Sequence, residues 1–141
     1  MDEGIAERAL AFALESGASY GEARLEATTT HAITTKNGVV QATSFEQHEG
    51  LGMRFIVNKK LGFLSTNELD EKHIREIIEK AIKKVKATKS LGQNTELADE
   101  KVHQVKYAVA QKIKLADMHI TERIQLLADI EKAIQQTNVR V

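Results

Sequence analysis

Residues 22–38 read EARLEATTTHAITTKNG, and this stretch decides the fold. Side chains alternate with the period of two that is typical of a strand. The more apolar set is Ala23, Leu25, Ala27, Thr29, His31, Ile33 and Thr35. The β-branched threonines suit a pleated surface better than a helix. Asn37 and Gly38 tolerate a positive φ, so the pair predicts a two-residue hairpin turn after the strand.

The residues after this turn predict a sheet built from successive hairpins. Residues 39–47 are expected to return antiparallel, and residues 50–57 read as a third strand. The run 58–60, Asn-Lys-Lys, predicts a second tight turn before a fourth strand over 61–66. Three hairpins in a row indicate an antiparallel meander, because a parallel sheet needs longer connections.

Three helices are expected around this meander. The first spans residues 2–16 and stops at Gly17. The second follows an N-cap at Asp70 and carries one apolar stripe: Ile74, Ile77, Ile78, Ala81, Ile82 and Val85. The third spans residues 122–136 and is expected to be capped by Thr121. An isolated helix of this length is marginal, so the second stripe must cover one face of the meander. The predicted fold class is α+β, an antiparallel β-meander packed on one face by helices.

The remaining segments carry weaker patterns. Residues 90–99 read as a loop, and residues 138–141 begin another β-prone run. The segment 102–109 fits two structures, because Val105, Tyr107 and Val109 alternate as in a strand, whereas Val102, Val105, Val109 and Ile113 have helical spacing. We predict extended structure here. Residues 1–141 are interpreted as a single α+β domain and as the N-terminal lobe of a longer, two-lobed protein.

The composition excludes several classes of function. The 141 residues include 20 basic and 20 acidic side chains, so a net charge of +0 argues against general affinity for nucleic acid or anionic membranes. Cysteine is absent, which excludes disulfides, thiolate catalysis and cysteine-ligated metals. No stretch approaches the roughly 20 apolar residues of a membrane span, and Met1-Asp2-Glu3 lacks the basic start of a secretory signal. We therefore expect a cytoplasmic protein without a membrane partner.

His48 and Glu49 provide the first two residues of a zinc-hydrolase pattern. In that pattern a second histidine follows one helical turn later. The fourth and fifth positions after His48 are Gly52 and Met53, so the second ligand is missing. A turn histidine is therefore the preferred interpretation over a metal site.

Gly50, Gly52 and Arg54 lie together in the expected third strand. The two glycines lack the third glycine and the helix of a dinucleotide-binding loop, so they indicate a bulge or a close backbone approach. Arg54 needs a carboxylate or carbonyl partner if its face is not solvated. The carboxylates available within the chain are Glu22, Glu26 and Glu49. Intramolecular pairing is preferred, and a peptide substrate or a partner domain is the functional alternative.

A lysine cluster and two histidines each allow a structural and a functional interpretation. The basic cluster consists of Lys72, Lys80, Lys83, Lys84, Lys86 and Lys89. A solvated helix face is preferred over a phosphate-contacting or acidic-partner surface, because glutamates interrupt the cluster and aromatic residues are missing nearby. His73, in the first turn of the same helix, is expected to face solvent. His31, on the more apolar strand face, is expected to be a neutral, hydrogen-bonded imidazole.

Five short motifs resemble one family in their order and spacing. They are GASYGEAR at 17–24, KNG at 36–38, EGLGMRF at 49–55, LGFLSTN at 61–67 and ITERIQLL at 120–127. Together they resemble the N-terminal region of the TldD/PmbA family, whose members are also labelled modulators of DNA gyrase. The resemblance spans nearly the whole chain, and each single motif is only moderately specific.

The resemblance implies a cytoplasmic, zinc-dependent metallopeptidase that acts on peptides or unfolded segments, in homodimers or in heterodimers of related subunits. The family's metal-binding helix, His-Glu-x-x-x-His, is not found in this chain, and some members lack it. No catalytic or metal-binding residue is therefore assigned, no cofactor is expected in this chain, and zinc is implied only for the longer parent.

These expectations combine into one functional prediction. The chain is a non-catalytic N-terminal lobe that shapes a peptide-substrate chamber and contacts a C-terminal catalytic lobe. The candidate peptide or interdomain contacts are Arg54, His48 and Glu49. The alternative is a protein-interaction or nucleic-acid-binding module that uses the lysine-rich helix 71–89. A stand-alone small enzyme has no supporting group of residues.

Overall fold

A computed structural model describes residues 2, 4–88, 94–98, 100–101 and 103–137 of the chain. Its internal contacts divide the chain into two compact units. Unit 1 consists of Met1–Thr29 and Gln47–Glu100, and unit 2 consists of Thr30–Glu46 and Lys101–Val141.

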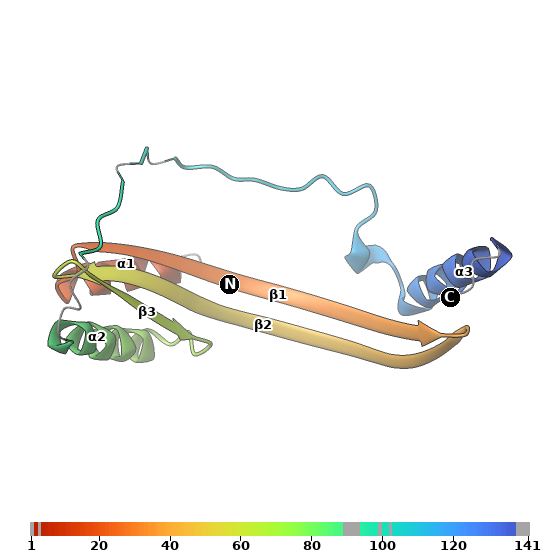
Figure 1. Cartoon of the computed structure of the whole chain (residues 1–141), viewed down its shortest axis with the longest axis horizontal. Helices are drawn as coiled ribbons and strands as arrows, with labels where there is room; N and C mark the ends of the chain where they lie inside the picture. Colours follow the sequence, from red (N-terminus) through yellow and green to blue (C-terminus); the bar gives the residue numbers. More distant parts are fainter. Residues whose placement is uncertain (1, 3, 89–93, 99, 102, 138–141) are drawn as a thin grey trace. The chain divides into compact units, whose positions relative to one another are not determined.

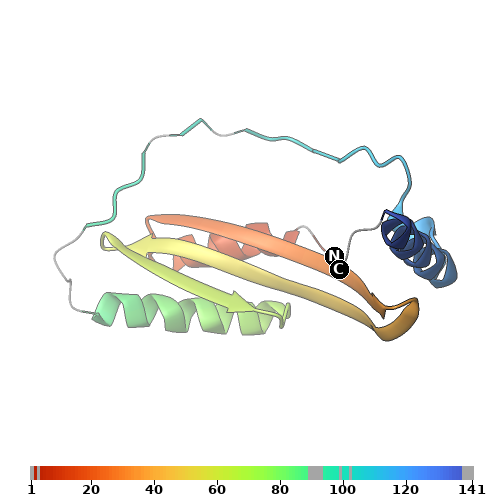
Figure 2. The ribbon, with the colours of Figure 1, turned by 45° about the vertical axis from the view of Figure 1, so that its right-hand side comes forward.

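Unit 1 combines two helices with a three-stranded antiparallel sheet (Figures 1 and 2). The element bounds are α1 Gly4–Glu15, β1 Tyr20–Lys36, β2 Val39–Val57, β3 Lys60–Thr66 and α2 Glu71–Ala87. β1 and β2 contribute residues to both units. The sheet order is β1-β2-β3, in which each strand pairs with its neighbour in sequence. The predicted class, an α+β fold with an antiparallel meander, is confirmed.

The number of strands differs from the prediction. β2 runs without interruption where two strands and a reversal near His48 were expected. Both observed reversals use residues with positive φ, namely Asn37 (51°) with Gly38 (73°) and Asn58 (50°) with Lys59 (62°). His48, Glu49 and Gly50 do not have positive φ, so the chain continues straight through them. His48 is therefore a strand residue, and the interpretation as a turn histidine was wrong.

The core of unit 1 lies between the sheet and its two helices. Alternate residues of β2 are buried against the helices: Leu51, Met53, Phe55 and Val57. From α2 the buried residues are Ile74, Ile78 and Ile82, which confirms the predicted stripe. From α1 they are Ala9, Phe12 and Ala13. This packing places both helices on one face of the sheet. The opposite face is not covered by a helix along Gly50, Gly52 and Arg54, whereas Ile56 further along β2 is buried.

Local sequence signals fix the ends of both helices. The Asp70 carboxylate accepts a hydrogen bond from the His73 amide at 3.0 Å, which confirms the predicted N-cap of α2. After α1, Gly17 adopts φ 97°. Its amide bonds the Leu14 carbonyl at 2.9 Å, and the Ala18 amide bonds the Ala13 carbonyl at 3.0 Å. This paired arrangement is a Schellman motif, for which glycine is the favoured residue.

Unit 2 contains the β1–β2 turn, a short 3-10 helix η1 (Leu115–Asp117) and helix α3 (Ile120–Gln136). The Gly38 amide donates to a Glu131 carboxylate oxygen at 2.8 Å, so the turn and α3 are joined within this unit. The N-cap of α3 is His119, and the prediction of Thr121 was wrong. The His119 ring accepts a hydrogen bond from the Thr121 amide, and the Glu122 carboxylate accepts one from the His119 amide at 2.9 Å. These reciprocal bonds form a capping box, which makes His119 the N-cap.

Residues 103–111 form neither a helix nor a paired strand. Extended structure was expected over 102–109. The described part of this segment is not a helix, and it does not pair with any strand of the sheet. Lys89, Val102, residues 138–141 and half of the expected 90–99 loop lie outside the described residues. No helix in the described part of the chain is long and apolar enough to cross a membrane.

Candidate functional site

The candidate site is the outer face of the unit 1 sheet, which we define as the face opposite α1 and α2. Because strand residues alternate between faces, Gly50, Gly52 and Arg54 point outward while their neighbours enter the core. In the register with β3, Gly52 pairs with Ser65 and Arg54 pairs with Phe63. Paired residues share a face, so Ser65 and Phe63 also lie on the outer face.

The absence of side chains at Gly50 and Gly52 leaves a hollow along β2, which we call the glycine groove. It consists of two adjoining depressions of about 470 and 740 Å³ that share Arg24, Gly52 and Ser65 as lining residues. The two glycines differ in their surroundings. A Cβ added to Gly50 would lie 3.0 Å from the Thr66 carbonyl oxygen, which confirms the predicted close backbone approach. A Cβ on Gly52 would meet nothing within 4 Å, so this part of the groove is open.

Arg54 lines the larger depression and forms a two-pronged ion pair with Glu22. Its Nε and Nη2 atoms each lie 2.5 Å from a Glu22 carboxylate oxygen. The Tyr20 hydroxyl also donates to Glu22. The predicted intramolecular pairing is thus confirmed, with Glu22 as the partner among the three carboxylates considered.

This contact keeps both partners charged. The hydrogen bond from Arg54 lowers the pKa of Glu22, and the bond from Tyr20 lowers it further. The same carboxylate raises the pKa of Arg54 and the pKa of Tyr20. Arg24, the other arginine of the groove, lies 2.8 Å from Glu26. The arginines of the groove are therefore compensated by carboxylates on β1.

His48 and Glu49 line the smaller depression, beyond Gly50 on the same strand. Three residues singled out from the sequence therefore lie along one groove: His48 and Glu49 beside one depression and Arg54 beside the other. Their suggested contact with a peptide or a neighbouring domain remains a prediction.

Phe63 is a groove residue that the sequence reasoning missed. Its ring lines the larger depression and remains 69% exposed, although it is an aromatic residue in a strand. The signal was available in the second turn, because a two-residue turn at Asn58 and Lys59 fixes the register that places Phe63 opposite Arg54. The groove therefore has an apolar side wall as well as charged residues.

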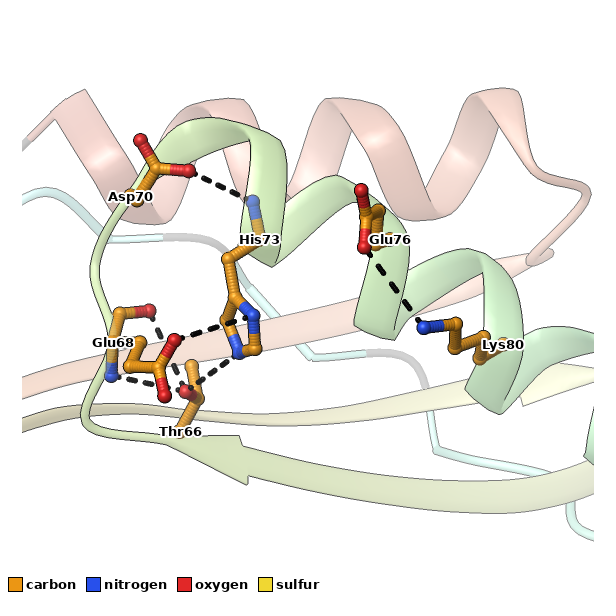
Figure 3. A network of polar contacts seen from close by, with 6 residues as sticks. All are labelled: Thr66, Glu68, Asp70, His73, Glu76 and Lys80. Carbon is orange, nitrogen blue, oxygen red and sulfur yellow. Dashed lines mark hydrogen bonds and ion pairs between the residues drawn. The ribbon is translucent and has the colours of Figure 1, made fainter.

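His73 contacts the end of β3 and does not face solvent as predicted (Figure 3). Its Nε2 atom lies 3.3 Å from the Thr66 hydroxyl, and its Nδ1 atom lies 3.5 Å from a Glu68 carboxylate oxygen. The prediction was wrong because the β3–α2 connection folds back beside the first turn of the helix. His31, by contrast, is exposed, and its ring makes an edge contact with Phe45, with the centroids 4.6 Å apart.

Several lysines on and beside α2 have structural contacts. Lys86 donates to the Ser16 carbonyl at 2.9 Å, and Lys60 donates to the Thr88 carbonyl. Lys80 lies 3.9 Å from Glu76 (Figure 3). The contacts of Lys86 and Lys60 satisfy carbonyls at the C-terminal ends of α1 and α2, where cations are favourable, and Lys80 pairs with a carboxylate one turn away. They give no specific support to a nucleic-acid interface on this helix.

The described residues do not form a metal site. Nowhere in the described ranges do three or more histidine, aspartate or glutamate side chains gather so that they could hold an ion. The residues present in this part of the chain therefore do not fit the zinc that the resemblance implies for the parent protein.

Part of the chain matches a known protein family. Residues 21–85 match the model of the PmbA/TldA metallopeptidase domain 1. Over this stretch the chain is similar to the first domain of the TldD/PmbA family. The matched residues run from β1 to α2 and include the strands that form the glycine groove.

One protein is similar to the chain in sequence, and one solved structure is similar to it in fold. A protein of Methanocaldococcus jannaschii, named Metalloprotease MJ0996, is 26% identical over 128 residues, covering 90% of this chain and 28% of that protein. The crystal structure of a candidate modulator of DNA gyrase from Bacteroides thetaiotaomicron has a TM-score of 0.76. It is 17% identical, covering 93% of this chain and 30% of that one, and supports the fold alone. The chain thus spans less than a third of the length of each of these two proteins.

Proposed function

We propose that the chain is a non-catalytic, substrate-facing domain of a TldD/PmbA-type metallopeptidase. It forms part of the wall of a peptide chamber, while the metal and the catalytic residues are supplied by a C-terminal lobe. The observation that carries this proposal is the open glycine groove, which lies on the uncovered face of the stretch that is similar to the family's first domain. Dimer formation through related subunits and a cytoplasmic location belong to the same proposal.

The sheet also offers a place for an extended peptide to bind. β3 is the last strand in the order β1-β2-β3, and no further strand pairs with it among the described residues. An edge strand presents unpaired backbone groups, and a peptide that adds a strand gains affinity largely independent of its sequence. Such binding suits a domain that presents varied unfolded segments to a protease.

The non-catalytic part of the proposal is tested with the purified chain. Incubation with zinc and a generic unfolded protein should give no cleavage products by mass spectrometry. Cleavage that a chelator abolishes would contradict the proposal, since it would place a metal-dependent active site within these residues.

The peptide-binding part is tested by fluorescence anisotropy with a labelled, neutral, unfolded peptide. Strand addition predicts binding that changes little with salt and falls at least about tenfold when alternate peptide amides are N-methylated, because methylation removes the donors of the ladder. The matched control carries N-methyl groups on the other alternate amides, which point away from β3. Loss of affinity that follows salt concentration steeply would favour the lysine-rich helix instead.

A further inference from the structure

We infer that the glycine groove is a side-chain pocket that selects a large apolar residue, preferably an aromatic one, at a single position of the bound peptide. The selected residue lies opposite Ser65, and its side chain extends across Ser65 toward the open space above Gly52. This inference rests on the proposed function, because it takes β3 as the strand that the peptide joins.

The pocket has space for such a side chain in the direction from β3 toward β2. Ser65 is small, and its partner Gly52 has nothing within 4 Å of the position that a Cβ would occupy. Strands lie about 4.8 Å apart, so Gly52 is two strand spacings, about 10 Å, from a peptide paired with β3. A short side chain stays beside β3, whereas a phenylalanine ring laid across Ser65 reaches the near edge of the open space above Gly52.

The lining favours an uncharged occupant. Arg54 is held by Glu22 in a two-pronged pair, and Arg24 is held by Glu26, so the arginines are already engaged. A charged peptide side chain would lose hydration in the groove or would have to break one of these pairs. Phe63 offers an exposed aromatic wall, against which a second ring gains from edge or offset contacts.

Phe63 is placed so that its ring does not cover Gly52. A glycine in a sheet is often covered by an aromatic ring from a neighbouring strand. Phe63 is only diagonal to Gly52, in the row of Arg54, and its ring leaves Gly52 uncovered. The surface above Gly52 is therefore left for a ring from outside the domain.

The test uses Gly52→Val, which fills the pocket without disturbing the fold. The new side chain has no close neighbour at Cβ, Gly52 does not have a positive φ, and valine is favoured in strands. Thr29→Val is the matched control, because it places the same branched side chain on β1 at an exposed position that is not among the groove's lining residues. Circular dichroism should show an unchanged fold in both variants.

Binding is measured by anisotropy with three peptides that differ only in having Phe, Ala or Asp at one central position. The parent chain should bind the Phe peptide about tenfold more tightly than the other two. Gly52→Val should reduce the affinity for the Phe peptide to that for the Ala peptide and leave the Ala peptide unaffected. Thr29→Val should behave as the parent.

The outcomes separate the inference from the function on which it rests. Equal affinity for all three peptides, or a Phe preference that survives in Gly52→Val, would overturn the side-chain pocket and leave the peptide-binding domain in place. Failure of every peptide to bind would overturn the proposed function itself.

Discussion

Units 1 and 2 both place a helix beside part of the same β-hairpin, yet only unit 1 has a core. The buried residues of the described chain all belong to unit 1. In unit 2 no described residue is buried, and many large apolar side chains remain exposed, among them Val105, Tyr107, Val109, Ile113 and Leu115. Both units therefore contain amphipathic segments, but among the described residues only those of unit 1 bury their apolar side chains.

Helices α2 and α3 show where this difference arises. Each has 17 residues and isoleucines at helical spacing. Ile78 of α2 is fully buried, whereas Ile130 of α3 is 48% exposed. Opposite α2 the sheet provides an alternating row of large apolar residues, while the strand segments within unit 2 contain four threonines and few large apolar residues. A helical stripe thus predicts an apolar face, but it does not reveal whether the same chain supplies the partner.

The largest expected effect comes from a matched pair of isoleucine truncations. Ile78→Ala should lower the free energy of unfolding of unit 1 by about 2–5 kcal/mol, because it opens a cavity in a closed core. Ile130→Ala should change stability by about 0.5 kcal/mol or less, because its side chain is half exposed. Urea unfolding followed by circular dichroism measures both, and comparable losses would remove the contrast between the units.

A second pair uses glycines of the sheet in unit 1. Gly62→Ala places a Cβ 2.6 Å from the Phe55 ring and 2.8 Å from Val85, so we expect a loss of about 1–3 kcal/mol from overpacking. Gly52→Ala meets open space and should leave stability unchanged or slightly raised. Thermal unfolding distinguishes the two variants. A destabilised Gly52→Ala would mean that the groove is not open.

The helix caps provide a third, smaller contrast. Asp70→Ala should destabilise unit 1 by about 1 kcal/mol through loss of the bond to the His73 amide. His119→Ala should reduce the helical signal of α3 without moving the unfolding transition of unit 1. The readout is helicity together with the urea midpoint. A shift of that midpoint by His119→Ala would show that α3 stabilises the core of unit 1.

The smallest effect concerns pH and the Glu22–Arg54 pair. Arg54 holds the pKa of Glu22 below its ordinary value of 4.5, so the charged carboxylate stabilises the fold above that pH. This contribution should be lost as the pH falls through the lowered pKa. The urea midpoint of Glu22→Gln should therefore lie below that of the parent at pH 7 and approach it in acid, as the pH falls through the lowered pKa.

The control for this titration lies in unit 2. Glu131→Gln replaces the acceptor of the Gly38 amide and should leave the unfolding midpoint of unit 1 unchanged at pH 7 and in acid. A gap between Glu22→Gln and the parent that persists or widens in acid would contradict the assigned role of Glu22.

Features that depend on neighbouring residues could be predicted from the sequence, whereas features that depend on distant residues could not. Turns at Asn37-Gly38 and Asn58-Lys59 and the Asp70 cap depend on neighbouring residues, and they were predicted. The continuity of β2 was missed because Gly50 was taken as a strand boundary, whereas its backbone is approached by Thr66. His73 was misplaced for a similar reason, since its partners lie in the preceding connection.

The candidate site was only partly visible in the sequence. Arg54 and its carboxylate partner could be proposed because a strand arginine needs compensation, and Glu22 was among the candidates. The groove itself depends on the register of three strands, which decides that Gly52 lies beside Ser65 and that Phe63 lies beside Arg54. Residue types alone do not provide that register.

Hydrogen exchange measured by mass spectrometry, with and without the Phe-containing peptide, tests the central claim most directly. If a peptide joins β3 of a self-sufficient unit 1, the added protection should fall on residues 60–66 and leave residues 30–46 and 120–136 exchanging as before. Protection that instead appears on α3 or on the β1–β2 turn, or no protection at all, would contradict a substrate-facing sheet in unit 1.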